Sequence, residues 1–253
     1  MKIILLGAGA LAFSLSKALL KENLELIQIY NKTPKVHAEL KKWPAVEFVY
    51  DKSFLKKADL YIICVSDKAI KEVSSFIPFD DVLVVHTSAA TPINLLKGNY
   101  RKGLLYPLQS FNKQKKISLK GVPFLIEAEN KKDISLLKKI STTLSGKFHI
   151  TTLEQRLKIH LSAIWACNFV NHLCHISHKI IDDSELPFDL LKPLIKETLS
   201  KINLLGPYKS QTGPAIRKDG ETLERHINLL SDPLEKEIYK LLSLSIEKTY
   251  HLS

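Results

Sequence analysis

The chain has 253 residues, 45% of them apolar and 25% charged, with nine glycines. This apolar content excludes a disordered chain, and so few glycines exclude a fibrous protein. The formal net charge is +11. All of that excess lies in residues 1–152, with 24 basic and 13 acidic residues, whereas residues 153–253 hold 13 of each. Length and charge asymmetry together predict two domains, 1–152 and 153–253.

The basic excess is compatible with nucleic acid, an anionic membrane or a phosphorylated ligand as a partner. Lysine supplies 33 of the 37 cations, however, and arginine only four. Nucleic-acid-binding surfaces favour arginine, whose planar guanidinium donates two hydrogen bonds at once, so a nucleic-acid-binding protein is the least favoured interpretation. A solvated lysine coat, with a few cations reserved for a phosphate, explains the charge better. No apolar run reaches the length that spans a membrane.

The three cysteines, Cys64, Cys167 and Cys174, lack Cys-x-x-Cys spacing and sit in apolar surroundings. Reduced, buried thiols are expected, and they favour a cytoplasmic protein. The apolar opening of residues 1–20 imitates a signal peptide, but it contains a nucleotide-type glycine pattern and leads into a second strand signal. We therefore expect it to belong to the fold.

Residues 1–152 alternate between strand and helix patterns, which predicts βαβ units and a mostly parallel, Rossmann-type sheet. The helices are expected at 10–22, 34–42 and 131–144. The strands are expected at 2–6, 25–30, 46–50, 59–67, 82–89, 103–107, 122–128 and 147–151.

Residues 153–253 predict an all-helical domain. From 153 to about 181 there is neither Gly nor Pro, which indicates one long helix. Asp189 is expected to cap a helix that runs to about residue 205, with Pro193 in its first turn. A loop over 206–219 follows, and helices at about 220–230 and 233–250 end the chain.

Between the first strand and the first helix lies the pattern Gly-x-Gly-x-x-Ala, from Gly7 to Ala12. Gly7 permits the tight turn, Gly9 lets a pyrophosphate approach the backbone, and Ala12 allows close packing of helix on strand. Ala10 and Leu11 then open a helix whose N–H groups and dipole favour an anion. We predict a dinucleotide site here; a Gly/Ala turn of another α/β fold is the alternative.

The second predicted strand ends in Asn31, Lys32 and Thr33, with Lys35 close behind. An NAD enzyme places an acidic residue at this point for the ribose hydroxyls. Here a cation, a hydroxyl and an amide could hold a 2′-phosphate instead. The sequence thus favours NADP(H) as cofactor, with Lys32 as an ordinary solvated turn residue as the alternative.

Two further strand ends are expected at the carboxyl edge of the sheet, where such folds bind ligands. Val65 and Ser66 end one strand, and Thr87 and Ser88 end the next. All four are candidates for cofactor contacts, although ordinary turns explain Thr87 and Ser88 equally well. Asp67 is expected to cap the following helix.

The long helix carries one polar stripe on a mainly apolar surface. At 100° per residue, His160, Asn168, Asn171, His175 and His178 fall within one sector. A helix this apolar should be buried on several sides, so the stripe faces either a ligand cleft or a dimer interface. The histidine spacing lacks the His-Glu-x-x-His pattern, and no metal site is expected.

The loop over 211–219 contains Gly, Pro, Asp219 and Arg217, and Arg225 follows. Arginine in a lysine-dominated chain suggests a planar hydrogen-bonding task, such as holding a carboxylate. The alternative is structural, an Arg217–Asp219 pair that fixes the loop.

Several motifs together resemble a known family: the glycine turn with its Asn-Lys-Thr segment, and the stretches at 65–70, 86–90, 106–111, 159–169 and 211–226. They are similar to the Rossmann-like oxidoreductases whose C-terminal half is a domain of unknown function, related to 6-phosphogluconate, 3-hydroxyisobutyrate and pyrroline-5-carboxylate enzymes. The resemblance implies an NADP-binding domain, an all-helical second domain and a homodimer through those helices. It also reveals a departure: the relatives' catalytic Lys falls at Ile164, and Tyr106 replaces a frequent His.

These observations predict an NADP(H)-dependent oxidoreductase that passes a hydride between the nicotinamide and a small carbonyl or imine substrate. His160 is the expected general acid or base, because imidazole titrates near neutrality. Asn168 would orient the substrate and Arg217 would clamp a carboxylate. The missing Lys supports an alternative, a catalytically idle NADPH-binding regulator.

Overall fold

The computed structural model describes residues 1–34, 43, 45–112 and 117–251. It divides into two compact units, Met1–Ile164 and Trp165–Ser253. The division falls about three helical turns beyond Leu153, where the predicted second domain begins.

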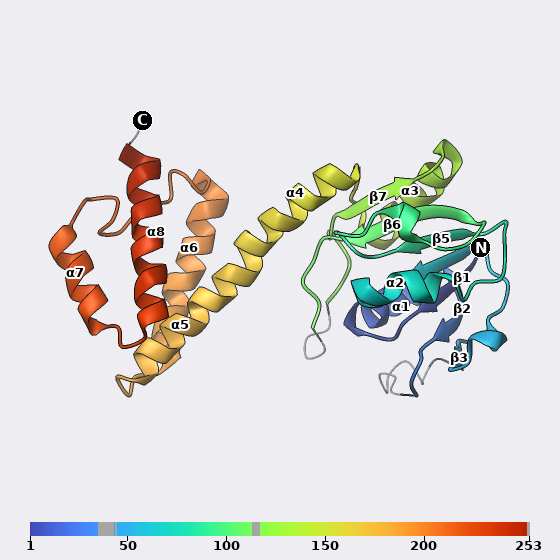
Figure 1. Cartoon of the computed structure of the whole chain (residues 1–253), viewed down its shortest axis with the longest axis horizontal. Coiled ribbons are helices and arrows are strands. Elements are labelled where there is room, and N and C mark those ends of the chain that lie inside the picture. The colour runs from blue at the N-terminus through green and yellow to red at the C-terminus, as the bar shows by residue number, and fades with distance from the viewer. Residues whose placement is uncertain (35–42, 44, 113–116, 252–253) are drawn as a thin grey trace. The chain divides into compact units, whose positions relative to one another are not determined.

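The first unit contains one sheet in the order β3-β2-β1-β4-β5-β6-β7-β8 (Figure 1). Neighbouring strands are parallel except for β6 and β7, which are antiparallel. The predicted fold class, a mostly parallel Rossmann-type sheet followed by helices, is confirmed. The strands are β1 (Lys2–Leu6), β2 (Glu25–Tyr30), β3 (Glu47–Val49), β4 (Leu60–Ile63), β5 (Leu83–His86), β6 (Arg101–Pro107), β7 (Phe124–Ala128) and β8 (Phe148–Ile150).

Both faces of this sheet are buried, which explains why its strands are continuous apolar runs rather than alternating ones. On β1, Ile3 and Leu5 join the core under α1 (Ala10–Lys21) and α3 (Lys131–Ser145). Ile4 and Leu6 join the opposite core, which α2 (Asp67–Ser74) covers through Ile70 and Val73. From β1 the following strands, β2 and β3, are added on one side of the sheet, whereas β4 and β5 are added on the other. Folds with such a reversal of strand order bind ligands at the carboxyl ends of the central strands, here β1 and β4.

The first unit ends with α4 (Leu153–Ala163), whose start is fixed by a capping box. The Thr152 hydroxyl accepts from the Gln155 N–H at 3.2 Å, and the Gln155 side chain accepts from the Thr152 N–H at 2.9 Å. These two bonds satisfy N–H groups that a helix start leaves open. The sequence Thr-x-x-Gln therefore sets where α4 begins.

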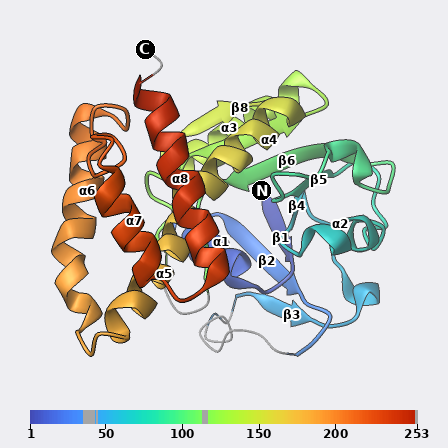
Figure 2. The ribbon, with the colours of Figure 1, turned by 60° about the vertical axis from the view of Figure 1, so that its left-hand side comes forward.

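The second unit is helical. A π-helical segment, η4 (Ile164–Phe169), continues α4 into α5 (Val170–Asp182). The short 3-10 turn η5 (Phe188–Leu191) precedes α6 (Lys192–Leu205), and α7 (Gly220–Leu229) lies beside α8 (Pro233–His251) (Figure 2). An ion pair of 2.5 Å between Lys179 and Glu235 ties α5 to α8.

Some local expectations are wrong. Asp189 caps no α-helix, because it lies inside η5, and α6 begins after Leu191 with Pro193 in its first turn. Asp67 is the first residue of α2 rather than its cap, which is Ser66. No residue of α5 is buried in the single chain, so the expected burial of the long helix on several sides stays a prediction. The helix expected at 34–42 falls almost wholly outside the described residues.

Candidate functional site

The glycine turn after β1 is locked against its neighbours. The Gly7 N–H donates to the carbonyl of Tyr30 at 2.7 Å, which joins the turn to the end of β2. Gly7 has a φ of +114°, and a Cβ at this position would overlap the carbonyl oxygen of Cys64. Glycine is required here for both reasons.

The start of α1 offers free donors to a ligand. Gly9 is the N-cap, and a Cβ at this position would meet nothing within 4 Å. The peptide N–H groups of Ala8, Gly9, Ala10 and Leu11 donate to no group in the part of the chain that the structure describes. The first turn of α1 contains no acidic residue. Open space, unpaired N–H groups and the positive end of the helix dipole fit a pyrophosphate.

The end of β2 presents a cation to solvent. The Asn31 side chain donates to the Thr33 carbonyl at 2.6 Å, which shapes the turn around Lys32. The Lys32 side chain is 83% exposed, and its Nζ lies 3.9 Å from a carboxylate oxygen of Glu72. Such an exposed pair contributes at most about 1 kcal/mol, so Lys32 can leave Glu72 for a phosphate. Lys35 lies outside the described residues.

At the ends of β4 and β5 the candidate residues differ in what they can still bind. The Ser66 hydroxyl makes no capping bond to α2, and Val65 is half-buried beside it. In contrast, the Thr87 hydroxyl donates to the Ile63 carbonyl at 3.1 Å. The Ser88 hydroxyl lies 2.9 Å from that of Thr91. Thr87 and Ser88 therefore build the loop with their side chains.

His86, the last residue of β5, is completely buried. Its Nδ1 accepts from the Ser88 N–H at 3.2 Å, while its Nε2 has no partner in the described part of the chain. Burial, followed by the nearby charge of Arg156, lowers the pKa of His86 to about 3. The ring is consequently neutral at physiological pH and acts as a fixed support for the loop.

Sequence reasoning missed Arg156, the largest fully buried side chain. From the first turns of α4, its Nε donates to the Ala89 carbonyl and its Nη2 to the Thr91 carbonyl, each at 2.9 Å. Its Nη1 is ion-paired with Glu127 of β7. The scarcity of arginine, which drew attention to Arg217 and Arg225, applies equally to Arg156 and could have found it.

The three predicted catalytic residues are divided between the units. His160 lies one turn beyond Arg156 on α4, so both face similar directions, and its Nδ1 is buried without a partner among the described residues. Asn168, in η4, and Arg217 are exposed and belong to the second unit. Arg156 and His160 thus share one helix of the first unit, and the catalytic roles of His160, Asn168 and Arg217 stay predictions.

Arg217 lies near Asp219, the cap of α7. The Asp219 carboxylate accepts from the Thr222 hydroxyl at 2.8 Å and from its N–H at 3.1 Å. These bonds, then the charges of Arg217 and Arg225, lower the pKa of Asp219. The predicted alternative, an Arg217–Asp219 ion pair within 4 Å, is not formed.

Tyr106 is a further polar group at the carboxyl end of β6. Burial, followed by the charge of Asp67 at the start of α2, raises the pKa of its phenol. The hydroxyl therefore keeps its proton at neutral pH and is a potential donor. Its departure from the relatives' histidine is the signal that could have marked it as a site residue.

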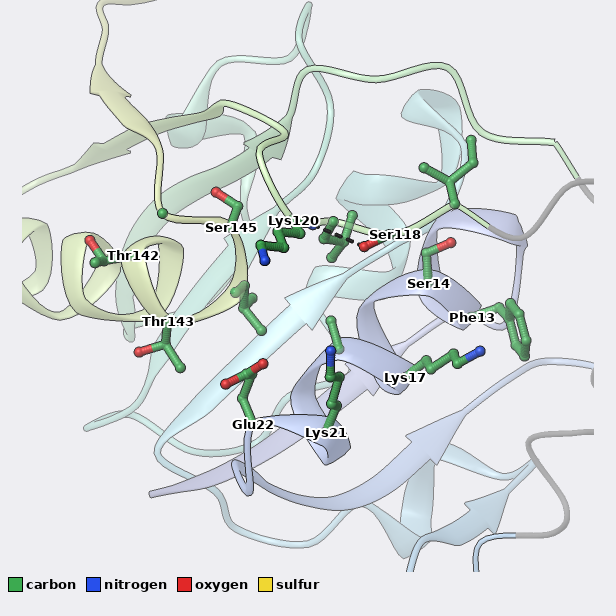
Figure 3. Close-up of a pocket in the computed structure, with 15 residues that line it drawn as sticks. Phe13, Ser14, Lys17, Lys21, Glu22, Ser118, Lys120, Thr142, Thr143 and Ser145 are labelled. Carbon is green, nitrogen blue, oxygen red and sulfur yellow. Dashed lines mark hydrogen bonds between the residues drawn. The ribbon is translucent and has the colours of Figure 1, made fainter.

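A cavity of about 610 Å³ lies elsewhere on the first unit, between α1 and the end of α3 (Figure 3). Lys17 and Lys21 project from α1, and Lys120 comes from the segment before β7. The other lining residues are Phe13, Ser14, Ala18, Glu22, Ile117, Ser118, Leu119, Thr142, Thr143, Leu144, Ser145 and Gly146. None of these lining residues belongs to the glycine turn or to the loops after β2, β4 and β5, so the cavity is separate from the candidate nucleotide site.

The described residues contain no group of three or more His, Cys, Asp or Glu side chains that could hold a metal ion. Among them, no helix has the length and apolar content needed to cross a membrane.

Two family models match the chain. Residues 2–90 match NADP oxidoreductase, coenzyme F420-dependent, and residues 122–246 match a domain of unknown function, DUF2520. No curated protein matches the sequence. The N-terminal family match, the parallel sheet and the glycine turn together define the class of the protein as an NAD(P)-dependent oxidoreductase.

Solved structures identify the family more closely. A Bacteroides fragilis protein, provisionally assigned as an NADP oxidoreductase, is 37% identical over 98% of both chains, with a TM-score of 0.90. The chain belongs to this family of NADP oxidoreductases with a DUF2520 domain, whose cofactor is NADP.

More distant structures share the fold. A Thermotoga maritima protein is 21% identical over 98% of both chains, with a TM-score of 0.75. The reductive aminase of Aspergillus terreus, solved with NADPH and ethyl-5-oxohexanoate, is 15% identical over 98% of this chain and 93% of its own, with a TM-score of 0.70.

Proposed function

We propose that the chain is an NADP(H)-dependent oxidoreductase acting on a small carbonyl or imine substrate. The observation that carries the proposal is the open Gly9 beside four unpaired N–H groups at the start of α1. When bound, the nicotinamide supplies or accepts a hydride. The reductive aminase among the structural neighbours supports the imine class.

The predicted site residues have distinct tasks in this proposal. The N–H groups from Ala8 to Leu11 hold the pyrophosphate, and Lys32, with Asn31 and Thr33, holds the 2′-phosphate. His160 moves the proton that accompanies reduction of the substrate. Asn168 orients the substrate oxygen or nitrogen, and Arg217 clamps a carboxylate.

The cofactor assignment is tested by titration with NADPH and NADH, monitored by nicotinamide fluorescence. Lys32→Glu should weaken NADPH binding at least tenfold and NADH binding much less, because a charge-assisted phosphate contact contributes about 1.5–3 kcal/mol. Lys139→Glu is the matched control: it makes the same charge change at an exposed position on α3. Equal affinity for both cofactors, unchanged by Lys32→Glu, would exclude the phosphate role.

Catalysis is tested by NADPH oxidation with a panel of aldehydes, ketones and imines. Oxidised coenzyme F420 belongs in the panel, because the N-terminal family model is described by it. His160→Ala should lower turnover roughly 10²- to 10⁴-fold, the usual contribution of a general acid. His149→Ala, at an exposed histidine of β8, is its control. Full turnover in His160→Ala would remove that assignment, and no turnover with any substrate would favour the idle regulator.

The assembly is also part of the proposal. Among the described residues of the second unit only Ala215 is buried, while Leu204 and Leu229 are 80% and 82% exposed. A second copy would cover these helices, and we propose a cytoplasmic homodimer without a nucleic-acid partner. Sedimentation should then give twice the 28.7 kDa chain mass.

A further inference from the structure

The loop after β5 occupies the half of the sheet edge that faces the reactive end of the cofactor. The glycine turn and Lys32 lie at the ends of β1 and β2, on one side of the point where the strand order reverses. A dinucleotide bound across that point places its other half over the ends of β4 and β5. The loop over residues 87–91 therefore lies at the nicotinamide end, an inference that rests on the proposed function.

This loop has no regular secondary structure, yet it is held at several atoms. Within the loop and its strand, the Thr87 hydroxyl donates to the Ile63 carbonyl, and the hydroxyls of Ser88 and Thr91 are hydrogen-bonded to each other. Arg156 adds two bonds from outside, to the carbonyls of Ala89 and Thr91. One rigid guanidinium thus fixes the two carbonyl groups on either side of Ala90.

With its carbonyls held, the loop leaves two donors unused. The N–H groups of Ala89 and Ala90 donate to nothing in the described part of the chain; Ala89 is only 5% exposed, whereas Ala90 is open to solvent. A buried N–H without a partner is unfavourable, because it has given up its hydrogen bonds to water. An acceptor oxygen at the nicotinamide end would recover that free energy, because this loop lies next to it.

The ion pair with Glu127 makes the arrangement specific to arginine. Arg156 is completely buried, and a buried cation must be paired and fully hydrogen-bonded. Glu127 neutralises the charge from β7, while the remaining N–H groups of the guanidinium reach the loop. A lysine has one compact ammonium and cannot reach all three acceptors in this planar arrangement.

We propose that Arg156, paired with Glu127, is a positioning residue for hydride transfer. It holds the 87–91 loop so that the N–H groups of Ala89 and Ala90 receive an acceptor oxygen of the nicotinamide or the substrate. It touches neither reactant, and acts only through the loop. The phosphates are bound elsewhere, so its loss should impair turnover much more than cofactor affinity.

The matched control lies at the opposite edge of the same sheet. There, Arg101 of β6 is ion-paired with Asp133 of α3, whose side chain is completely buried. Arg101→Lys disturbs a second arginine–carboxylate pair, but at the amino ends of the strands, away from the cofactor. Any effect of Arg156→Lys that exceeds that of Arg101→Lys at equal thermal stability belongs to the position, not to the loss of an ion pair.

The kinetic test measures kcat, NADPH affinity and the isotope effect with 4-deuterated NADPH. Arg156→Lys should lower kcat at least tenfold, change the NADPH Kd less than threefold and raise the isotope effect, because the hydride step becomes slower. Glu127→Gln, which keeps the side-chain shape, should change the same quantities in the same direction by less. A loss of kcat no larger than in Arg101→Lys, or a parallel loss of NADPH affinity, would overturn the proposal.

A second measurement does not depend on turnover. Amide hydrogen exchange in a peptide that covers the 87–91 loop should slow when NADPH binds to the wild-type chain and to Arg101→Lys, but not to Arg156→Lys. Loop protection that is unchanged in Arg156→Lys would contradict the proposal. If the wild-type chain turns over no substrate while its loop is still protected by NADPH, the proposed function fails and the positioning of the loop stands.

Discussion

The two units of the chain differ in how they treat their apolar side chains. In the first, strands such as β1, β4 and β5 are almost completely buried under helices on both faces. In the second, Ala215 is the single buried residue among those described, and leucines on α6, α7 and α8 are exposed. The first unit buries its apolar side chains within itself, whereas the second leaves an apolar surface that another molecule can cover.

This difference shows that similar sequence patterns can have different thermodynamic consequences. An apolar strand in the first unit stabilises the single chain, because its partners are other segments of the same unit. An apolar helix face in the second unit contributes only after association. Three sets of variants test this comparison.

The largest expected effect comes from leucine truncations in the two units. Leu104→Ala, at a completely buried position on β6, should lower the free energy of unfolding by about 2–5 kcal/mol. Leu204→Ala, at an 80% exposed position on α6, should change it by less than about 0.5 kcal/mol in the isolated chain. Urea unfolding of both variants, at several protein concentrations, measures the contrast.

A loss of unfolding free energy above about 1.5 kcal/mol in Leu204→Ala that depends on protein concentration would support the comparison. It would show that association buries α6 in solution. A cost that is large but independent of concentration would show instead that the second unit is packed within one chain.

The next effect concerns the pH dependence of the first unit. The pKa of His86 is 6.5 in an ordinary environment and about 3 in the fold. Between these values the unfolded chain binds a proton that the folded chain does not. The His86 contribution is therefore complete above pH 6.5 and is lost as the pH falls toward 3, by up to about 1.4 kcal/mol per pH unit.

Urea unfolding between pH 7 and pH 5 measures this slope. His86→Asn can still accept the Ser88 N–H but has no proton to bind in this range. It should reduce the slope relative to the wild-type chain. Identical slopes in the two proteins would show that His86 is not the group responsible.

The smallest effect comes from matched helix caps. Asn130 caps α3 in the first unit by accepting from the Asp133 N–H at 2.9 Å, and Asp219 caps α7 in the second. Asn130→Ala and Asp219→Ala should each cost about 1 kcal/mol. Amide hydrogen exchange should become faster only in the unit that carries the substitution. Faster exchange in α3 of Asp219→Ala would show that the two units unfold together.

Much of the fold could be predicted because its signals are local. Apolar runs separated by helical stretches predict the parallel sheet, and the glycine turn falls at the end of β1 as expected. The antiparallel pairing of β6 and β7 could not be read in this way, since it is set by long-range register. Arg156 was missed for a similar reason: its partners Ala89 and Glu127 are 67 and 29 residues away.

The predicted polar stripe shows a different limit. It assumes one uninterrupted α-helix from His160 to His178, but η4 is a π-helix between them. A π turn contains an extra residue, which shifts the following side chains by about 100°. His160 therefore cannot be assigned to one face with Asn171, His175 and His178 from spacing alone.

Cys64 packs directly behind the glycine turn, and this burial makes its thiol less reactive than those of Cys167 and Cys174. Burial raises the pKa of Cys64, whose carbonyl backs Gly7, to about 12, whereas Cys167 is exposed and Cys174 half-buried. Alkylating reagents attack the thiolate, so at neutral pH they should label the second unit and leave the first untouched. The chain thus carries its own attachment points for a fluorophore or spin label on the helical unit, at a distance in sequence from the nucleotide-binding turn.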